Sequence, residues 1–482
     1  MTTTATSPAP ARPAASVDRR TRVARIAVVA AAVALWFVPV PDGLTPPAWR
    51  LFVLFAAAIV SVVVNAFPIL TASVLAVSAA VLTGLLPPAK AYTGFANGTI
   101  LLIVLAFLVA RAVVLSGLGT RVGYFVVSIF GRSTLGLSYS IFLVDAVIAP
   151  AFPSNTARSG VIYPLAFSLT EAAGARPDDE GSRRIGTFLM FSGIASLSLS
   201  SALWLTAMAA NPLGAEIART FGVDIGFTRW LLAASLPTIV AMAVMPLLLA
   251  WLIRPERTAT PDAPEVARRA LDALGPLTRR ERIVLAVFVG MVGLWAVAAT
   301  FALDSTAVAF LGLGVMLASG VLTLGDIAKE GDVLATFIWF AVLYTLSTQL
   351  NELGFMGFLG QRIAGSLAGF PVLAAGAVLV VAYVLLHYMF VSQTAHTLAL
   401  FGVFLEVGIK LGVPAAPLAF QLLFATNYFA AITPQGSSAN LLFAESGFLS
   451  QRDLYRLGAL LTAFCLVLYL TVGTLWLRVV LP

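Results

Sequence analysis

The 482-residue chain contains one cysteine and two histidines, and only 11% of its residues are charged. The single cysteine, Cys465, excludes an internal disulfide framework, and two histidines exclude a multi-histidine metal centre. Soluble globular domains carry about 25% charged residues, so the shortage of charge argues against that class as well. The net charge of +7 does not indicate nucleic-acid binding, because the arginines concentrate in short loops and the N-terminal tail.

Long apolar runs are present instead, and hydrophobic residues make up 60% of the chain. Runs long enough to cross a hydrocarbon core of about 30 Å recur along the whole sequence. We predict an all-α polytopic membrane protein, in a bacterial plasma membrane, with about 11 transmembrane helices. The predicted spans are 24–40, 49–66, 69–86, 99–116, 184–218, 229–253, 282–301, 306–324, 334–352, 417–449 and 455–480.

Two further apolar regions, 134–173 and 372–411, are too long for one crossing and too short for two. Polar residues interrupt both, as "PSNTARS" in the first and "SQTAHT" in the second. We interpret both regions as re-entrant hairpins. The Arg-rich segment 254–281 then falls on the same side as the N-terminus, and the positive-inside rule places both in the cytoplasm. The first hairpin would enter from the cytoplasm and the second from outside.

Entry from opposite sides suggests an inverted repeat, and the sequence contains matching segments. "SNTAR" at 154–158 matches "SQTAH" at 392–396, and "WLTAMAANPLG" at 204–214 matches "AITPQGSSANLLF" at 431–443. Non-helical backbone at membrane depth is tolerated only inside protein or beside a cavity. Two tips and two broken helices therefore predict one shared polar cavity, where helix N-termini and polar side chains can bind an anion.

The predicted organisation has six parts. They are a disordered cytoplasmic tail (1–25), N-terminal scaffold helices (26–98), repeat 1 (99–253, with hairpin 134–173 and broken helix 184–218), a cytoplasmic linker (254–281), further scaffold helices (282–333) and repeat 2 (334–482, with hairpin 372–411 and broken helix 417–449).

The segment "PSNTARSGVIYPLAFSLTEAAGARPDDEGSRRIGTFLM" resembles the first hairpin and following loop of the divalent anion/sodium symporter family, solute carrier family 13. "LHYMFVSQTAH" and "WLTAMAANPLG" resemble its 2-oxoglutarate/malate translocator and citrate/succinate antiporter branch, and the likeness covers residues 50–480. The resemblance implies a transporter of di- and tricarboxylates such as succinate, malate, 2-oxoglutarate and citrate, and no enzyme. It also implies a homodimer whose transport domain slides against a scaffold domain, as in an elevator.

By match to the family's motifs, both tips and both broken helices would contact the substrate. The residues so predicted are Ser154, Asn155, Thr156, Thr206, Asn211, Ser392, Gln393, Thr394, Thr433, Gly436, Ser437 and Ser438. Sodium-coupled members bind two sodium ions at these places, whereas we expect no metal or other cofactor here. Gln393 and "ITPQG" depart from the expected pattern, so the sequence leaves the carried carboxylate open.

Arg158 and His396 occupy equivalent positions, two residues after each tip threonine. A charged side chain at membrane depth costs about 2.5–3.5 kcal/mol, so two at matching positions suggest a function. We hypothesise that they bind the dianion in place of two sodium ions, which would favour exchange because the empty carrier keeps its charge. Two alternatives stay open: an ion pair of Arg158 with Asp145, about 7 Å away along the hairpin, and a neutral His396.

Three other functions are compatible with parts of this pattern. Sodium-coupled symport would use the same tips, and an anion channel would line a pore with the same donors. An intramembrane hydrolase would pair Ser154 or Ser392 with His396, but the sequence lacks the G-x-S-x-G elbow and an acid placed to orient the histidine.

Overall fold

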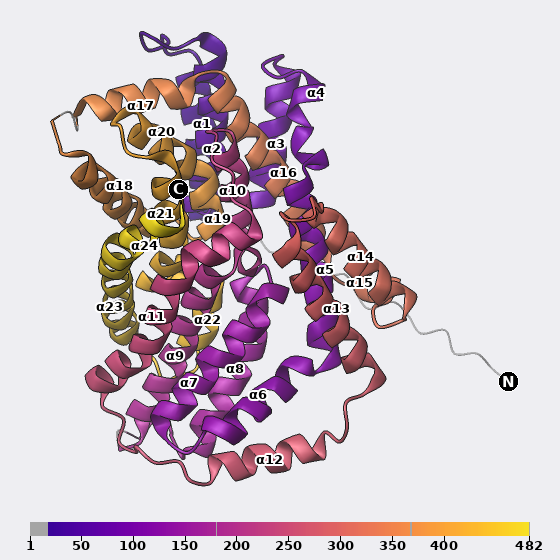
Figure 1. Ribbon diagram of the computed structural model, residues 1–482. Coiled ribbons are helices and arrows are strands. Elements are labelled where there is room, and N and C mark those ends of the chain that lie inside the picture. The colour runs from indigo at the N-terminus through magenta and orange to yellow at the C-terminus, as the bar shows by residue number, and fades with distance from the viewer. Residues whose placement is uncertain (1–17, 180, 367–368, 482) are drawn as a thin grey trace.

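The computed structural model describes residues 18–179, 181–366 and 369–481. Within these ranges the chain is helical, apart from one isolated bridge between Ser133 and Ala259 (Figure 1). Nine helices of the described residues are long and apolar enough to cross a membrane. Seven match predicted spans, and the other two, Thr134–Ala151 and Val372–Met389, are the first arms of the hairpins. The predicted all-α membrane protein is confirmed.

One group of helices, here called the scaffold bundle, comes from the N-terminal quarter and the middle of the chain. Its members are α1 (Arg19–Trp36), α2 (Pro46–Val63), α3 (Ile69–Leu82), α4 (Pro88–Ala91), η1 (Thr93–Ala96), α5 (Gly98–Ser116), α13 (Arg279–Val297), α14 (Ser305–Ala318), α15 (Leu324–Ala328) and α16 (Gly331–Glu352). The tail prediction was too long, because residues 19–25 already belong to α1, while residues 1–17 lie outside the described ranges.

The second group, here called the hairpin bundle, contains both hairpins and both broken helices. From repeat 1 it has α7 (Thr134–Ile148), η2 (Ala149–Ala151), α8 (Asn155–Ala172), α9 (Arg183–Leu203), η3 (Leu205–Ala207), α10 (Ala210–Arg219) and α11 (Phe227–Ile253). From repeat 2 it has α18 (Val372–Leu386), η4 (His387–Met389), α19 (Gln393–His396), η5 (Thr397–Phe401), α20 (Gly402–Lys410), α21 (Ala415–Tyr428), η6 (Phe429–Ile432), η7 (Pro434–Gly436), α22 (Ser438–Ala444), α23 (Gln451–Leu468), η8 (Tyr469–Gly473) and α24 (Thr474–Val480).

Two arm helices connect the bundles, and a third helix lies in the linker. The arms are α6 (Leu118–Phe130) and α17 (Phe355–Ser366), and the linker helix is α12 (Ala263–Ala273). In Figure 1, α6, α7 and α12 lie toward the lower end of the molecule, whereas α17, α18 and α20 lie toward the upper end. The two hairpins therefore extend from opposite ends, as the inverted repeat requires.

Two asparagines hold the breaks of the two broken helices in the same way. Asn211 Nδ2 donates to the carbonyl oxygens ten and seven residues earlier in the chain, at 2.9 and 3.2 Å. Asn440 Nδ2 donates to the carbonyl oxygens ten and seven residues before it, at 2.8 and 3.0 Å. Because the same residue type makes the same two bonds at the same spacing, the structure confirms the internal repeat.

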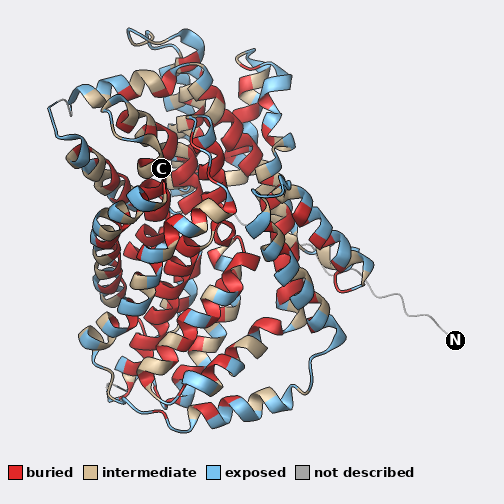
Figure 2. Cartoon of the chain, viewed as in Figure 1, coloured by how far each residue is buried: buried red, intermediate tan, exposed pale blue. Residues whose placement is uncertain are grey.

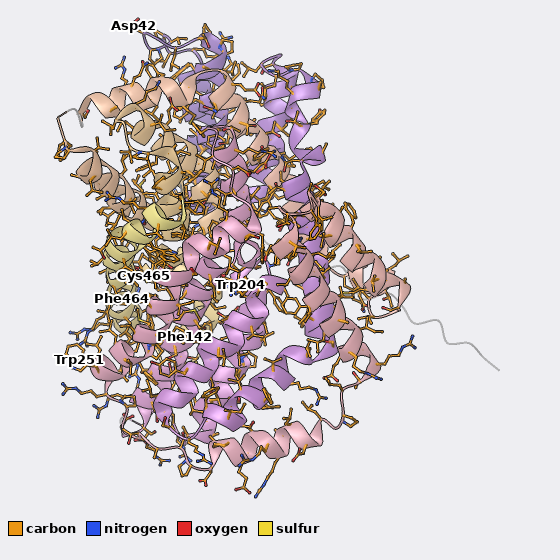
Figure 3. All side chains as sticks on the ribbon, viewed as in Figure 1. Asp42, Phe142, Trp204, Trp251, Phe464 and Cys465 are labelled. Carbon is orange, nitrogen blue, oxygen red and sulfur yellow. The ribbon has the colours of Figure 1, made fainter. Side chains whose placement is uncertain are left out.

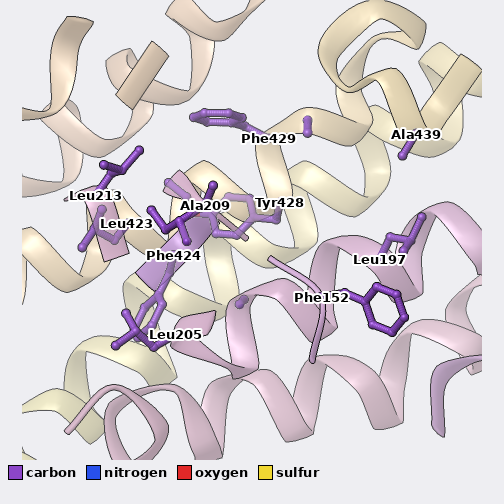
Figure 4. Close-up of a cluster of buried hydrophobic side chains, with 14 of the residues drawn as sticks. Phe152, Leu197, Leu205, Ala209, Leu213, Leu423, Phe424, Tyr428, Phe429 and Ala439 are labelled. Atoms are coloured by element: carbon purple, nitrogen blue, oxygen red, sulfur yellow. The ribbon is translucent and has the colours of Figure 1, made fainter. Parts of the chain in front are cut away.

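The core of the hairpin bundle forms around α9, which is buried from Ile185 to Leu203 (Figure 2). Apolar side chains pack behind the first tip and the breaks, including Phe152, Leu197, Leu213 and Phe424 (Figure 4). Cys465 is fully buried in this core (Figure 3). This packing fixes the backbone from which the polar tips project.

Candidate functional site

Both hairpin tips face one cavity of about 440 Å³ between the hairpin bundle and the scaffold bundle. The hairpin bundle contributes mainly polar side chains, and the scaffold bundle contributes both aromatic and polar or acidic ones. Lining residues include Ser154, Asn155, Thr156, Met208, Ser392, Gln393, Thr394, Ser437 and Ser438 on one wall, and Phe107, Glu330, Asp332, Thr336, Trp339 and Phe340 on the other.

The first tip is a short turn followed by a helix N-terminus. The 3-10 turn η2 ends in extended backbone, and Ser154 then caps α8, because its Oγ accepts from the Ala157 N–H at 3.2 Å. Serine is a preferred N-cap residue, so the sequence itself dictates where this helix starts. The N-terminal end of α8 therefore lies at the cavity. The uncapped N–H groups of its first turn and the positive end of its helix dipole are found there.

The second tip repeats this geometry. The 3-10 turn η4 precedes it, and Ser392 Oγ accepts from the Ala395 N–H at 3.3 Å. The helix that begins at Gln393 continues through the π-helical turn η5 into α20. Two helix N-termini thus converge on one cavity, an arrangement suited to an anion that carries two negative groups.

Hydrogen bonds join elements of the two repeats across the cavity. Asn155 Nδ2 donates to Gln393 Oε1 at 3.3 Å. The hydroxyls of Thr156 and Ser438 lie 2.7 Å apart, linking the first tip to the second broken helix. Gln393 Nε2 donates to the Thr426 carbonyl at 2.8 Å, which turns its Oε1 toward the first tip. The tips therefore form one connected polar surface.

Arg158 is fully buried behind the first tip and does not line the cavity. It forms the ion pair with Asp145 that was the alternative considered from the sequence, with Nη1 and Oδ1 3.2 Å apart. Its guanidinium also donates to Ser200 Oγ at 2.6 Å and to the Leu197 carbonyl at 3.0 Å. Arg158, for which a direct substrate contact was predicted, therefore lies behind the cavity lining in this structure.

Arg158 acts on the cavity through Asn155. Its Nη2 donates to Asn155 Oδ1 at 2.5 Å, and the hydroxyl of Ser201 donates to the same oxygen at 2.6 Å. With two donors on Oδ1, the amide is oriented with its NH₂ group toward Gln393 and the cavity. Arg158 is therefore a positioning residue for the tip.

His396 is fully buried behind the second tip, among aromatic rings. Its ring centroid lies 4.3 Å from that of Tyr383, 4.8 Å from those of Phe390 and Phe429, and 5.3 Å from that of His387. Neither ring nitrogen has a hydrogen-bond partner among the described residues, and Ser392 Oγ is used as the helix cap. The side chain does not line the cavity, and the geometry offers no serine–histidine dyad.

Some of the remaining predicted residues line the cavity, and the others lie behind it. Ser437 and Ser438 line the cavity. Thr206 Oγ1 donates to the Pro150 carbonyl at 2.9 Å, and Asn211 holds the first break, so both support the tip from behind. Thr433 and Gly436, which form the second break, are buried outside the cavity lining, and the Gly436 carbonyl lies 3.1 Å from His387 Nε2.

Sequence reasoning missed the scaffold wall of the cavity. Glu330 and Asp332 lie at the start of α16, and Glu330 pairs with Arg111 of α5 at 2.8 Å. The acids come directly after the short helix α15, in the polar segment 325–332, and such a segment by itself is typical of a solvated turn, so no sequence signal marked them. Among the described residues, no three His, Cys, Asp or Glu side chains come together as a metal site.

The fold and the site define a polytopic helical membrane protein built from an inverted repeat, with paired hairpin tips at a central polar cavity. Residues 19–481 match the family model described as the sodium:sulfate symporter transmembrane region, and the chain belongs to that family.

The curated relatives are transporters. The chain is 39% identical to the putative malate transporter YflS of Bacillus subtilis, over 94% of this chain and 95% of that one. It is 37% identical to dicarboxylate transporter 2, chloroplastic, of Spinacia oleracea (92% and 79%) and 32% identical to the citrate/succinate antiporter of Escherichia coli (91% and 94%).

Two solved structures share the fold. The YdaH transporter of Alcanivorax borkumensis aligns with a TM-score of 0.56 at 17% identity, over 81% of this chain and 87% of that chain. MtrF of Neisseria gonorrhoeae aligns with a TM-score of 0.55 at 15% identity, over 95% and 97%. At these identities the likeness concerns the fold alone.

Proposed function

We propose that this protein exchanges di- and tricarboxylates across the plasma membrane of a bacterium, with its N-terminus in the cytoplasm. The observation that carries the proposal is the pair of capped helix N-termini whose hydroxyl and amide groups converge on one cavity. Two such donor clusters match a substrate with two carboxylates. The relatives from Bacillus, Escherichia and spinach, which are named as malate, citrate/succinate and dicarboxylate transporters, support the same substrate class.

In this proposal the tip residues hold the substrate. Ser154, Thr156, Thr394 and Ser437 supply hydroxyl donors, and the first-turn N–H groups of α8 and of the helix that begins at Gln393 supply backbone donors. The substrate is bound between parts of both repeats, so a displacement of the hairpin bundle relative to the scaffold bundle would carry it across. This is the elevator form of alternating access, expected in a homodimer.

Exchange is favoured over sodium symport by the surroundings of Arg158. Its guanidinium is enclosed by oxygen atoms of Asp145, Asn155, Leu197, Ser200 and Ser201. Hard cations such as sodium take ligands of this type, so the guanidinium fills a set of oxygens that otherwise suits a small cation. The guanidinium is covalently attached and cannot dissociate, so sodium cannot bind and leave at this position during transport. A sodium gradient therefore cannot drive transport through this position.

A counterflow assay with purified protein in liposomes tests the function. Vesicles loaded with succinate, malate, 2-oxoglutarate or citrate should accumulate labelled dicarboxylate, and unlabelled substrates should compete. A carrier shows this trans-stimulation and saturates. Uptake that is linear in concentration and indifferent to the internal anion would indicate a channel and contradict the proposal. Absence of carboxylate uptake under all loadings would contradict the substrate class.

A further inference from the structure

Glu216 of α10 connects the hairpin bundle to the scaffold bundle at a place away from the tips. The side chain is 9% exposed. Its Oε1 accepts from Asn97 Nδ2 at 3.1 Å and from the Tyr344 hydroxyl at 3.4 Å, and its Oε2 accepts from Thr99 Oγ1 at 3.1 Å. Three donors from two scaffold helices thus converge on one carboxylate of the other bundle.

The scaffold side of this contact is rigid. The Gly94 N–H of η1 donates to Thr345 Oγ1 of α16 at 2.9 Å, beside Tyr344. A Cβ at Gly94 would lie 2.1 Å from the Ala341 carbonyl oxygen, so η1 and α16 are in direct backbone contact. Asn97, Thr99 and Tyr344 lie close in sequence to this contact, so its tight packing holds the three donors in place relative to one another.

The Asn97 amide can point only one way. Its Oδ1 caps α5 by accepting from the Ile100 N–H at 3.1 Å, which leaves the NH₂ group for Glu216. On the other side of the contact, Arg219 pairs with Glu216 from the same helix. Arg219 stays with Glu216 if the bundles separate, so release does not leave a bare carboxylate and the cost of breaking the contact is reduced.

The Glu216 contact lies on the far side of the cavity from Glu330. Along α16, Glu330 lies at the start and Phe340 is the last cavity-lining residue, whereas Tyr344 is one turn further, about 6 Å along the axis. Along α5, Asn97 precedes the lining residue Phe107 by ten positions, about 15 Å. Along both helices the cavity lies between Glu330 and the residues that bind Glu216. The Glu216 contact therefore lies at the end of the cavity opposite to Glu330.

We infer that Glu216 is the gate contact that closes the Asn97 side of the substrate cavity. Opening to that side requires its hydrogen bonds to Asn97, Thr99 and Tyr344 to break while Arg219 remains bound. The inference rests on the proposed alternating access. It makes Glu216 a residue that sets which side of the membrane the empty carrier faces, without contact to substrate.

The test is labelling of a cysteine at Ser438, which lines the cavity and moves with the hairpin bundle, with an impermeant maleimide in intact cells and in inverted vesicles. Cys465 is fully buried, so the parent chain gives the background. The preparation in which Ser438→Cys reacts faster identifies the side to which the parent cavity opens, which is the Glu330 side. Asn97→Asp keeps the helix cap but sets a second carboxylate against Glu216, and Glu216→Gln removes the charge. Both should raise labelling from the other side about tenfold, equivalent to about 1.4 kcal/mol.

Glu352→Gln is the matched control, because Glu352 pairs with Lys90 at 2.8 Å within the scaffold bundle and does not cross to the hairpin bundle. Its labelling should equal that of the parent. If Asn97→Asp does not accumulate in membranes, Thr99→Val replaces it. Equal labelling in the gate variants and in Glu352→Gln would overturn the inference. Labelling needs no substrate, so a protein that fails the counterflow assay refutes the proposed function separately.

Discussion

Asn155 Nδ2 and Gln393 Oε1 lie 3.3 Å apart, although 238 residues separate them in the chain. This bond joins the tips of two hairpins that come from opposite ends of the molecule. Asn155 is oriented by Arg158, and Gln393 is oriented by the Thr426 carbonyl. The polar surface of the cavity is therefore set from behind, by residues that do not line it.

Two substitutions of Gln393 distinguish the effect of an added negative charge from the effect of a shorter side chain. Gln393→Glu keeps the length but loses the donor to Thr426 and sets a negative charge beside the bound dianion, so we expect apparent affinity to fall about 100-fold, or about 2.8 kcal/mol. Gln393→Asn keeps a neutral amide but is one methylene shorter, so it weakens the bonds to Asn155 and Thr426 without adding charge. A loss of tenfold or less is expected, equivalent to about 1.4 kcal/mol or less. Concentration dependence of counterflow measures both. Equal losses would contradict the placement of Gln393 beside the bound dianion.

Replacement of Arg158 by alanine should make the thermal stability of the protein depend on sodium. In Arg158→Ala, Asp145 and the neighbouring oxygens lose their cation, which costs about 3–5 kcal/mol for a broken buried pair. Sodium can bind in the vacated space and stabilise the folded state, by an amount that grows with the logarithm of its concentration once the site is nearly saturated. The midpoint of thermal unfolding should therefore be higher in sodium chloride than in choline chloride for this variant, and the same in both salts for the parent. A variant indifferent to sodium would contradict the oxygen-cage interpretation.

Both asparagines that hold the helix breaks should contribute to the stability of the folded protein. Asn211→Ala and Asn440→Ala each leave two buried carbonyl oxygens without their donor, at about 1–3 kcal/mol for an unsatisfied group. We expect both variants to unfold at lower temperature and to lose transport, with the larger decrease for Asn211→Ala because Asn211 Oδ1 also accepts from Asn427 Nδ2 at 3.0 Å. A large effect at one position and none at the other would contradict the structural equivalence of the repeats.

Backbone contact between α23 and η6 makes Gly458 intolerant of any side chain. A Cβ there would lie 1.9 Å from the Ala431 carbonyl oxygen, so Gly458→Ala should abolish stable expression. Gly290 of α13 has open space around it, and Gly290→Ala should be neutral or stabilise by up to about 1 kcal/mol. Fluorescence-detected size-exclusion chromatography of membrane extracts compares the two. Normal expression of Gly458→Ala would show that the helices can separate there.

Much of this architecture is legible in the sequence because the membrane imposes simple rules. Apolar length predicted the spans, and polar interruptions within apolar runs located the tips at Ser154 and Ser392, where serine caps start helices. The pairing of Asn211 with Asn440 was visible as a match between segments, because the backbone bonds of a break require the same residue type at the same spacing.

The sequence could not reveal which buried groups meet. Arg158 matches His396 in position, yet one forms an ion pair with Asp145 and the other is surrounded by aromatic rings. That difference depends on serines of α9, which are 42 or more residues away in the chain. The acids at the start of α16 were missed for the same reason, since only the packing of α16 against the tips brings them to the cavity.

Uptake of labelled dicarboxylate into liposomes, with and without internal dicarboxylate and with and without an inward sodium gradient, tests the central claim most directly. The account predicts uptake that requires internal dicarboxylate and is unchanged by sodium. Concentrative uptake into vesicles without internal dicarboxylate, driven by the sodium gradient alone, would contradict it.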